Sequence, residues 1–267
     1  MANSAKMNGR NYIIIPQGSY QNNTNVRNES DVDICVCYQD VYHANFFYAP
    51  GESITSMGDT PSQRVFAEDR QAIGAALRAT FAPGISEGSN AFEVHSNTSR
   101  VDADVVAAWR FRGYSKNENT GEVSYREGVT YWTSSGKQVI NFPEQHHRNG
   151  VEKNNRTGRA FKRTVRIVKR MRYLMLAREV GAADGVASFF IESALYNFPD
   201  SVYTDYRTWK ETVRDVLTRM LRAEGASEWV EISGFKWLFK PNYGIPAKWT
   251  IEQMQAFARE ALRLLDQ

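Results

Sequence analysis

Two aspartates separated by one residue are the first candidates for chemistry in this chain, Asp31 and Asp33. On an extended strand, side chains two positions apart project from the same face, so these two carboxylates lie close together. Carboxylates held this close repel each other, and a divalent cation such as Mg²⁺ relieves the repulsion. The alternative is a solvent-exposed strand whose aspartates bind nothing. The spacing alone leaves both interpretations open.

A glycine and a serine, Gly18 and Ser19, precede this pair by about twelve residues, closely after Pro16. A glycine there allows backbone N–H groups to approach a triphosphate, and the serine hydroxyl can donate to it. Asp102 and Asp104 alternate in the same way as the first pair, and either can complete a cluster of three carboxylates. Such a cluster with Mg²⁺ or Mn²⁺ can orient or deprotonate a hydroxyl that attacks a phosphate. The pattern favours nucleotidyl transfer.

The elements that must position these residues divide the chain into a mixed half and a helical half. Alternating or β-branched runs predict strands over residues 12–15, 31–38 and 101–111, and a helix opened by Thr60 and Pro61 over residues 61–80. Helices are expected over residues 158–180, 186–196, 203–223 and 250–265. We expect an α+β protein with a mixed-sheet lobe over residues 1–150 and a helical lobe over residues 151–267. The polar stretch 144–156 marks the boundary, and an active-site cleft is expected between the lobes.

Charge is distributed unevenly between the two halves. The chain carries +3 in total, but residues 1–150 hold 13 basic and 16 acidic residues, whereas residues 151–267 hold 20 and 14. Residues 153–172 contain nine basic residues and no acidic one, and Lys162, Arg166, Lys169 and Arg170 share one helical face. This stripe is either a phosphate-binding surface or a solvated helix face.

Several classes of protein are excluded or disfavoured. No apolar run approaches the roughly 20 residues that a membrane span needs, and the first residues lack the apolar region of a secretory signal. We therefore expect a cytoplasmic protein with no membrane association. Cys35 and Cys37 are too close in sequence to pair without strain, so they are expected to be reduced core residues.

Several motifs resemble one known family. The first half of the chain contains three motifs: Gly18-Ser19, Ser30-Asp-Val-Asp-Ile34 and Val101-Asp-Ala-Asp-Val-Val-Ala107. They resemble motifs of the bacterial cGAS/DncV-like nucleotidyltransferases of the polymerase-β superfamily. Two segments of the second half resemble the same family, and its clade E in particular: Phe161–Lys169 and Ser188–Pro199. The resemblance implies a polymerase-β-like fold. Members of this family usually have a long helix before the Gly-Ser strand, and here about eleven residues precede Tyr12.

The resemblance also implies roles for individual residues in the first half. Asp31, Asp33 and Asp104 match the metal-binding catalytic carboxylates. Asp104 is preferred to Asp102 because the third carboxylate of the family begins an Asp-Val-Val run, as Asp104 does here. Gly18 and Ser19 match the residues that hold the donor phosphates.

In the helical half, Lys169 and Ser188 match positions that hold the triphosphate, and Phe189 matches the aromatic residue that stacks on the donor base. A plain core role for Phe189 remains open. Beside these, His146 and His147 are expected in an exposed boundary loop. Asn154 and Asn155 are expected in the loop before the basic helix, where they either hydrogen-bond the edge of a nucleotide base or cap that helix.

As function, the resemblance implies an enzyme that makes a cyclic oligonucleotide, most simply a cyclic dinucleotide, from nucleoside triphosphates with Mg²⁺ or Mn²⁺. Such a product is a second messenger for a separate effector protein in anti-phage signalling. Two alternatives remain open. A nucleotidyltransferase that modifies RNA or a protein would use the same carboxylates, and the basic segment would then hold the RNA. A catalytically silent module that binds nucleotides or nucleic acid is the other.

Overall fold

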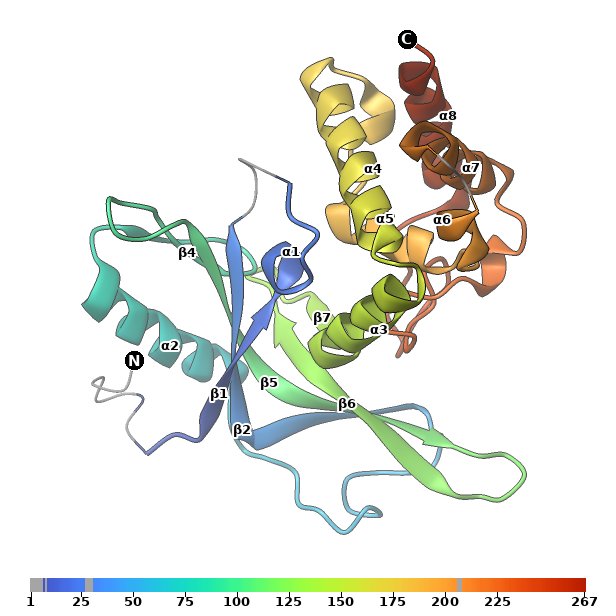
Figure 1. Ribbon diagram of the computed structural model, residues 1–267. Coiled ribbons are helices and arrows are strands. Elements are labelled where there is room, and N and C mark those ends of the chain that lie inside the picture. The colour runs from blue at the N-terminus through green and yellow to red at the C-terminus, as the bar shows by residue number, and fades with distance from the viewer. Residues whose placement is uncertain (1–6, 8, 27–30, 206–207) are drawn as a thin grey trace. The chain divides into compact units, whose positions relative to one another are not determined.

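The computed structural model describes residues 7, 9–26, 31–205 and 208–267, which form two compact units (Figure 1). One unit consists of Met1–Tyr20 and Asp31–Pro143, and the other of Gln21–Ser30 and Glu144–Gln267. The stretch expected as a polar boundary is a helix, α3 (Pro143–Arg156), whose only buried residues are Gly150 and Lys153. Its polar composition reflects exposure rather than a linker, and residue 150 falls within it.

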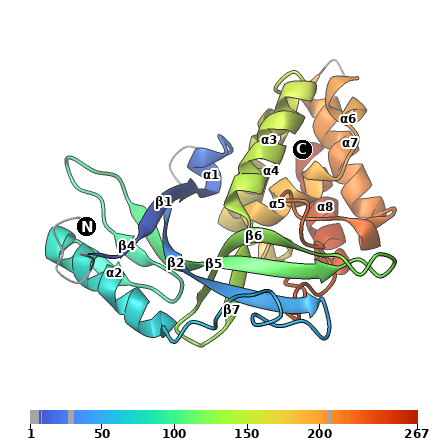
Figure 2. The same ribbon diagram turned by 90° about the horizontal axis from the view of Figure 1, so that it is seen from below.

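The first unit is built on a seven-stranded mixed sheet, in which β2 and β5 are parallel and the other pairs antiparallel. Its strands run in the order β1-β2-β5-β4-β3, with β6 paired to β5 and β7 to β6. Their bounds are β1 Tyr12–Gln17, β2 Val32–Tyr48, β3 Ile85–Glu87, β4 Phe92–Val94, β5 Ala103–Lys116, β6 Val123–Trp132 and β7 Gln138–Asn141. The three predicted strands are confirmed as β1, β2 and β5. Figure 2 shows the long β2, β5 and β6 lying side by side.

One face of the sheet packs on helix α2 (Phe66–Phe81), whose buried Ile73 and Leu77 meet Val36 of β2 and Val105 of β5. The helix begins at Phe66 rather than at Pro61 as predicted, because Val65 is still extended and no side chain caps it. The segment before it instead places Arg64 in ion pairs with Asp40 and Asp69.

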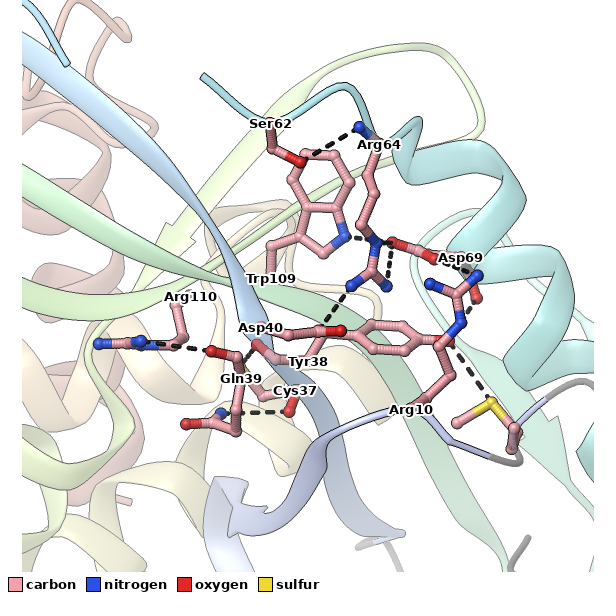
Figure 3. A network of polar contacts seen from close by, with 11 residues as sticks. Arg10, Cys37, Tyr38, Gln39, Asp40, Ser62, Arg64, Asp69, Trp109 and Arg110 are labelled. Carbon is pink, nitrogen blue, oxygen red and sulfur yellow. Dashed lines mark hydrogen bonds and ion pairs between the residues drawn. The ribbon is translucent and has the colours of Figure 1, made fainter. Parts of the chain in front are cut away.

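A buried carboxylate ties α2 to the sheet (Figure 3). Asp69 accepts hydrogen bonds from Trp109 Nε1 at 2.8 Å and from Arg64 Nε at 3.0 Å. Tyr38 Oη donates to the Asp69 carbonyl at 3.3 Å, and burial raises the pKa of Tyr38 to about 12. These contacts connect α2 to both β2 and β5, so the two strands that carry Asp33 and Asp104 have a rigid support.

The opposite face of the sheet is lined by Cys35 and Cys37, which pack with Ala108 and Val129. Both thiols are buried and free, as predicted, and burial raises the pKa of Cys35 well above its usual value. Side chains alternate along a strand, so Asp33 lies on the face of these cysteines and not on the face that α2 covers.

The second unit is helical, and its core gathers Phe161, Val165, Phe190 and Leu217. Besides α3, its helices are α4 Ala160–Ala177, α5 Ser188–Tyr196, α6 Ser201–Thr204, α7 Trp209–Arg222 and α8 Ile251–Leu265, with short 3₁₀ turns at Gly181–Ala183 and Ala226–Glu228. The four predicted helices are confirmed except that the third is divided into α6 and α7. None of the helices in the described part of the chain is long and apolar enough to cross a membrane.

Candidate functional site

Strand register places three acidic residues in one row across the first unit's sheet. Asp33 of β2 pairs with Asp104 of β5, and Asp104 pairs in turn with Glu93 of β4. Residues directly opposite each other on neighbouring strands project from the same face. The row therefore gathers carboxylates on the side of the sheet that α2 leaves open.

Electrostatics places Asp31 beside this row as well. The pKa of Asp104 is raised, first by burial and then by the negative charges of Asp31 and Glu93. Asp102 lies in a different environment, because its Oδ1 accepts the backbone N–H of Ser96 at 2.7 Å, and this hydrogen bond lowers its pKa. Of the two alternating aspartates, Asp104 lies opposite Asp33 on the neighbouring strand, whereas Asp102 is hydrogen-bonded to the backbone of Ser96.

Gly18 lies directly against Asp33. It begins the short helix α1 (Gly18–Gln21) with φ +69°, a conformation that side chains rarely adopt. A Cβ at this position would lie 1.7 Å from Asp33 Oδ2. The turn needs glycine both for its backbone conformation and for this close approach. Ser19 follows this glycine directly in the chain.

The donor set fits a hard divalent cation, although the geometry does not form a closed metal cage. Within the described residues, no group of three or more His, Cys, Asp and Glu side chains is arranged to hold a metal ion. Mg²⁺ commonly takes only one or two carboxylates and completes its shell with water and substrate phosphate oxygens. The paired Asp33 and Asp104 meet this requirement, with Asp31 as the third expected ligand.

The three residues predicted in the helical half lie on α4 and α5. Lys169 is only 3% exposed, and its Nζ donates to the Thr24 carbonyl at 2.7 Å. Ser188 is the first residue of α5. The Phe189 ring is half-buried, with its centroid 5.4 Å from that of His146 and 6.1 Å from that of Trp249. Their contact with a nucleotide stays a prediction.

The basic segment 153–172 does not form one exposed stripe. Lys153, Lys162 and Lys169 are buried. Lys153 Nζ donates to the Phe198 carbonyl at 2.6 Å and pairs with Asp200 at 3.1 Å, and burial lowers the pKa of Lys153 and of Lys162. Three arginines of the segment line an open hollow of about 680 Å³ beside α4. Its lining residues are Arg163, Arg166, Ile167, Arg170, Met171, Leu174 and Trp209.

Four polar residues expected in loops belong to α3 instead. Asn154 Oδ1 accepts the backbone N–H of Lys162 at 3.1 Å, which favours its capping role near the start of α4. His146 Nε2 lies 3.2 Å from Glu192 Oε1 of α5. The prediction of an exposed histidine loop is wrong, because these side chains turn toward neighbouring helices.

Comparison with known proteins identifies the family of this chain. Residues 148–266 match the model of the cGAS/DncV-like nucleotidyltransferase C-terminal helical domain. A cyclic dipyrimidine nucleotide synthase of Legionella pneumophila is 35% identical over 246 residues, which are 91% of this chain and 80% of the relative. The chain belongs to the cGAS/DncV-like nucleotidyltransferases.

Solved structures of cyclic dinucleotide synthases share the fold of this nucleotidyltransferase. One from Elizabethkingia meningoseptica, solved with GTP and Apcpp, has a TM-score of 0.79 at 30% identity and is matched over 100% of this chain and 89% of its own. The c-UMP-AMP synthase of Rhodothermus marinus, solved with Apcpp and Upnpp, has a TM-score of 0.79 at 29% identity over 95% and 83%. The predicted polymerase-β-like α+β fold is confirmed.

Two residues of this nucleotidyltransferase lie at the carboxylate row without a signal in the sequence. Glu93 sits on a strand of three residues, too short for alternation to reveal it. Tyr131 of β6 has its pKa raised by burial and then by the charges of Cys35 and Asp33, which places its hydroxyl near the row. Strand pairing brings both to the site, through the pairing of β4 with β5 and of β6 with β5.

Proposed function

We propose that this nucleotidyltransferase joins two nucleoside triphosphates into a cyclic dinucleotide. The paired Asp33 and Asp104, with Gly18 against Asp33, carry the proposal. Its support is that relatives covering most of the chain are named cyclic dinucleotide synthases, among them a cyclic dipurine nucleotide synthase of Elizabethkingia meningoseptica that is 32% identical over 234 residues.

In each of two transfers, a ribose hydroxyl oxygen of one nucleotide forms a bond to the α-phosphorus of the other. The bond from that phosphorus to the α,β-bridging oxygen breaks, and pyrophosphate leaves. Asp104 accepts the hydroxyl proton, a role that suits its raised pKa because a stronger base takes a proton more readily. Asp31 and Asp33 with Asp104 would hold Mg²⁺, which when bound supplies neutralisation of the charge on the reacting phosphate.

The remaining predicted residues bind and orient the donor nucleotide. The Gly18 backbone and the Ser19 hydroxyl donate hydrogen bonds to its phosphates. Lys169 and Ser188 hold the triphosphate, and Phe189 stacks on the base. In this proposal the product acts in the cytoplasm as a second messenger for a separate effector in anti-phage signalling, as the family resemblance implies.

The decisive experiment incubates the protein with all four nucleoside triphosphates and Mg²⁺ and analyses the products by mass spectrometry after phosphatase treatment. All four are needed because the relatives' names include dipyrimidine and dipurine synthases. A phosphatase-resistant cyclic dinucleotide that is absent with Asp33→Asn supports the proposal.

The same experiment separates the alternatives. Parallel reactions contain RNA or bacterial protein extract together with a labelled triphosphate. Label transferred to RNA or protein without a small cyclic product would assign the chain to macromolecule modification. Binding of triphosphate without pyrophosphate release would identify a catalytically silent module.

A further inference from the structure

The segment that follows α1 is held by side chains rather than by secondary structure. His147 hydrogen-bonds to the backbone of Gln21, Arg166 Nη1 donates to the Asn23 carbonyl at 2.7 Å, and Lys169 Nζ donates to the Thr24 carbonyl at 2.7 Å. These donors come from α3 and α4. Three side chains thus hold the backbone at three nearby positions, and these contacts fix the path of the chain here.

Thr24 is the most deeply anchored residue of this segment. It is fully buried, and its Oγ1 donates to Glu192 Oε2 of α5 at 3.2 Å. Both its carbonyl and its hydroxyl are therefore engaged, the first by Lys169 and the second by Glu192. A hydrogen bond to a charged group is about twice as strong as one between neutral groups, so the Glu192 contact is a strong link between Thr24 and α5.

Glu192 is buried, yet its pKa is lowered. Burial raises the pKa, but the neighbouring His146, the charge of Lys169 and the hydrogen bond from Thr24 outweigh it and hold the pKa of Glu192 below its usual value. Its second oxygen, Oε1, lies 3.2 Å from His146 Nε2. One carboxylate thus joins three chain segments: the one containing Thr24, α3 and α4.

We propose that Glu192 is a positioning residue that acts through Thr24 to hold the nucleotide-binding turn at Gly18 and Ser19. This inference rests on the proposed function of that turn. Only four residues separate Ser19 from Thr24, and the first two of them belong to α1. The chain that connects Thr24 to Ser19 is therefore short, and we expect the affinity for nucleoside triphosphate to fall when the anchor is removed.

Four variants test the anchor. Thr24→Val removes the hydroxyl and preserves the shape of the side chain, whereas Thr24→Ser retains the hydroxyl. Glu192→Gln removes the charge with little change in shape, and the double variant Thr24→Val/Glu192→Gln completes a thermodynamic cycle. Thr164→Val is the matched control, because Thr164 is equally buried and its hydroxyl donates to the Ala160 carbonyl within its own helix α4, at 3.0 Å.

Three quantities are measured for each variant: hydrogen exchange of peptides covering residues 18–26 without nucleotide, affinity for α,β-methylene ATP with Mg²⁺ by calorimetry, and pyrophosphate release. We expect Thr24→Val and Glu192→Gln each to speed exchange and to weaken analogue binding about tenfold. Thr24→Ser should restore most of the affinity, and the double variant should lose less than the product of the single losses.

Exchange and affinity in Thr24→Val equal to those in Thr164→Val would overturn the inference, and so would fully multiplicative losses in the double variant. Failure of the proposed function is a separate result. If the parent protein releases no pyrophosphate, that function is wrong, while hydrogen exchange without nucleotide still decides whether Glu192 holds the turn.

Discussion

Replacing Gly18 by alanine tests the geometry of the carboxylate row most directly. The added Cβ would lie 1.7 Å from Asp33 Oδ2, so either the carboxylate or the turn must move by about 1 Å or more. A shift of that size typically lowers turnover about 100-fold. The strain of the backbone itself is a small additional effect, because an alanine in the left-handed region lowers the free energy of unfolding by about 1 kcal/mol.

The control for Gly18→Ala is Gly121→Ala. Gly121 has nearly the same conformation, φ +73° against +69°, but a Cβ there would meet nothing within 4 Å. Gly121→Ala should lose a few degrees in Tm and Gly18→Ala at least as much, because its added methyl group must also be accommodated, and only Gly18→Ala should lose pyrophosphate release under saturating Mg²⁺ and triphosphate. Equal turnover in the two variants would show that Asp33 does not act from the position described.

Four further expectations concern other residues. Asp104→Asn should lower turnover about 100-fold, whereas Asp102→Asn should change it about twofold at most; equal losses would mean that the wrong carboxylate has been chosen. Because burial and the charges of Asp31 and Glu93 raise the pKa of Asp104, its carboxyl group should titrate above the ordinary Asp value of about 3.9 when followed by NMR without Mg²⁺, and a titration at or below that value would contradict its place in the row. Lys169→Ala should raise KM for triphosphate about tenfold in steady-state kinetics, and an unchanged KM would leave Lys169 with a structural role only. Asp69→Ala leaves Arg64 and Trp109 without their buried acceptor, so urea unfolding should show a loss of about 3 kcal/mol, and a loss below about 1 kcal/mol would refute the importance of this network.

The strands that carry the carboxylates could be predicted because they combine two local signals. Alternation around Asp31 and Asp33 and the β-branched run before Pro16 are both visible within a few residues. The same reasoning located α5 and α8, and Thr250 caps α8 by accepting the backbone N–H of Gln253 at 3.1 Å. Local pattern was sufficient wherever burial repeats with a regular period.

The remaining features depend on contacts between residues distant in sequence. Helix α3 buries little, so it lacks the apolar stripe that marks a helix. From the sequence, Lys169 is a cation on an exposed helix face. In the structure it is buried, because its Nζ donates to the Thr24 carbonyl, 145 positions away in sequence. Spacing alone could not separate Asp102 from Asp104, and the register of β2 with β5 supports the choice of Asp104 that the family resemblance implied.

The discontinuity of the two units has a consequence for how the chain is made. The polypeptide passes between them after Tyr20, after Ser30 and after Pro143, so the N-terminal part of the helical unit is synthesised long before the helices that hold it. Thr24 leaves the ribosome well before Glu192, and its hydroxyl and carbonyl have no native partners during that interval. Contacts of such sequence separation form late in folding. A gene divided after Pro143 would put Thr24 and Glu192 on different polypeptides, so production of the helical half alone would leave an ionised carboxylate in its core without the threonine that pairs with it.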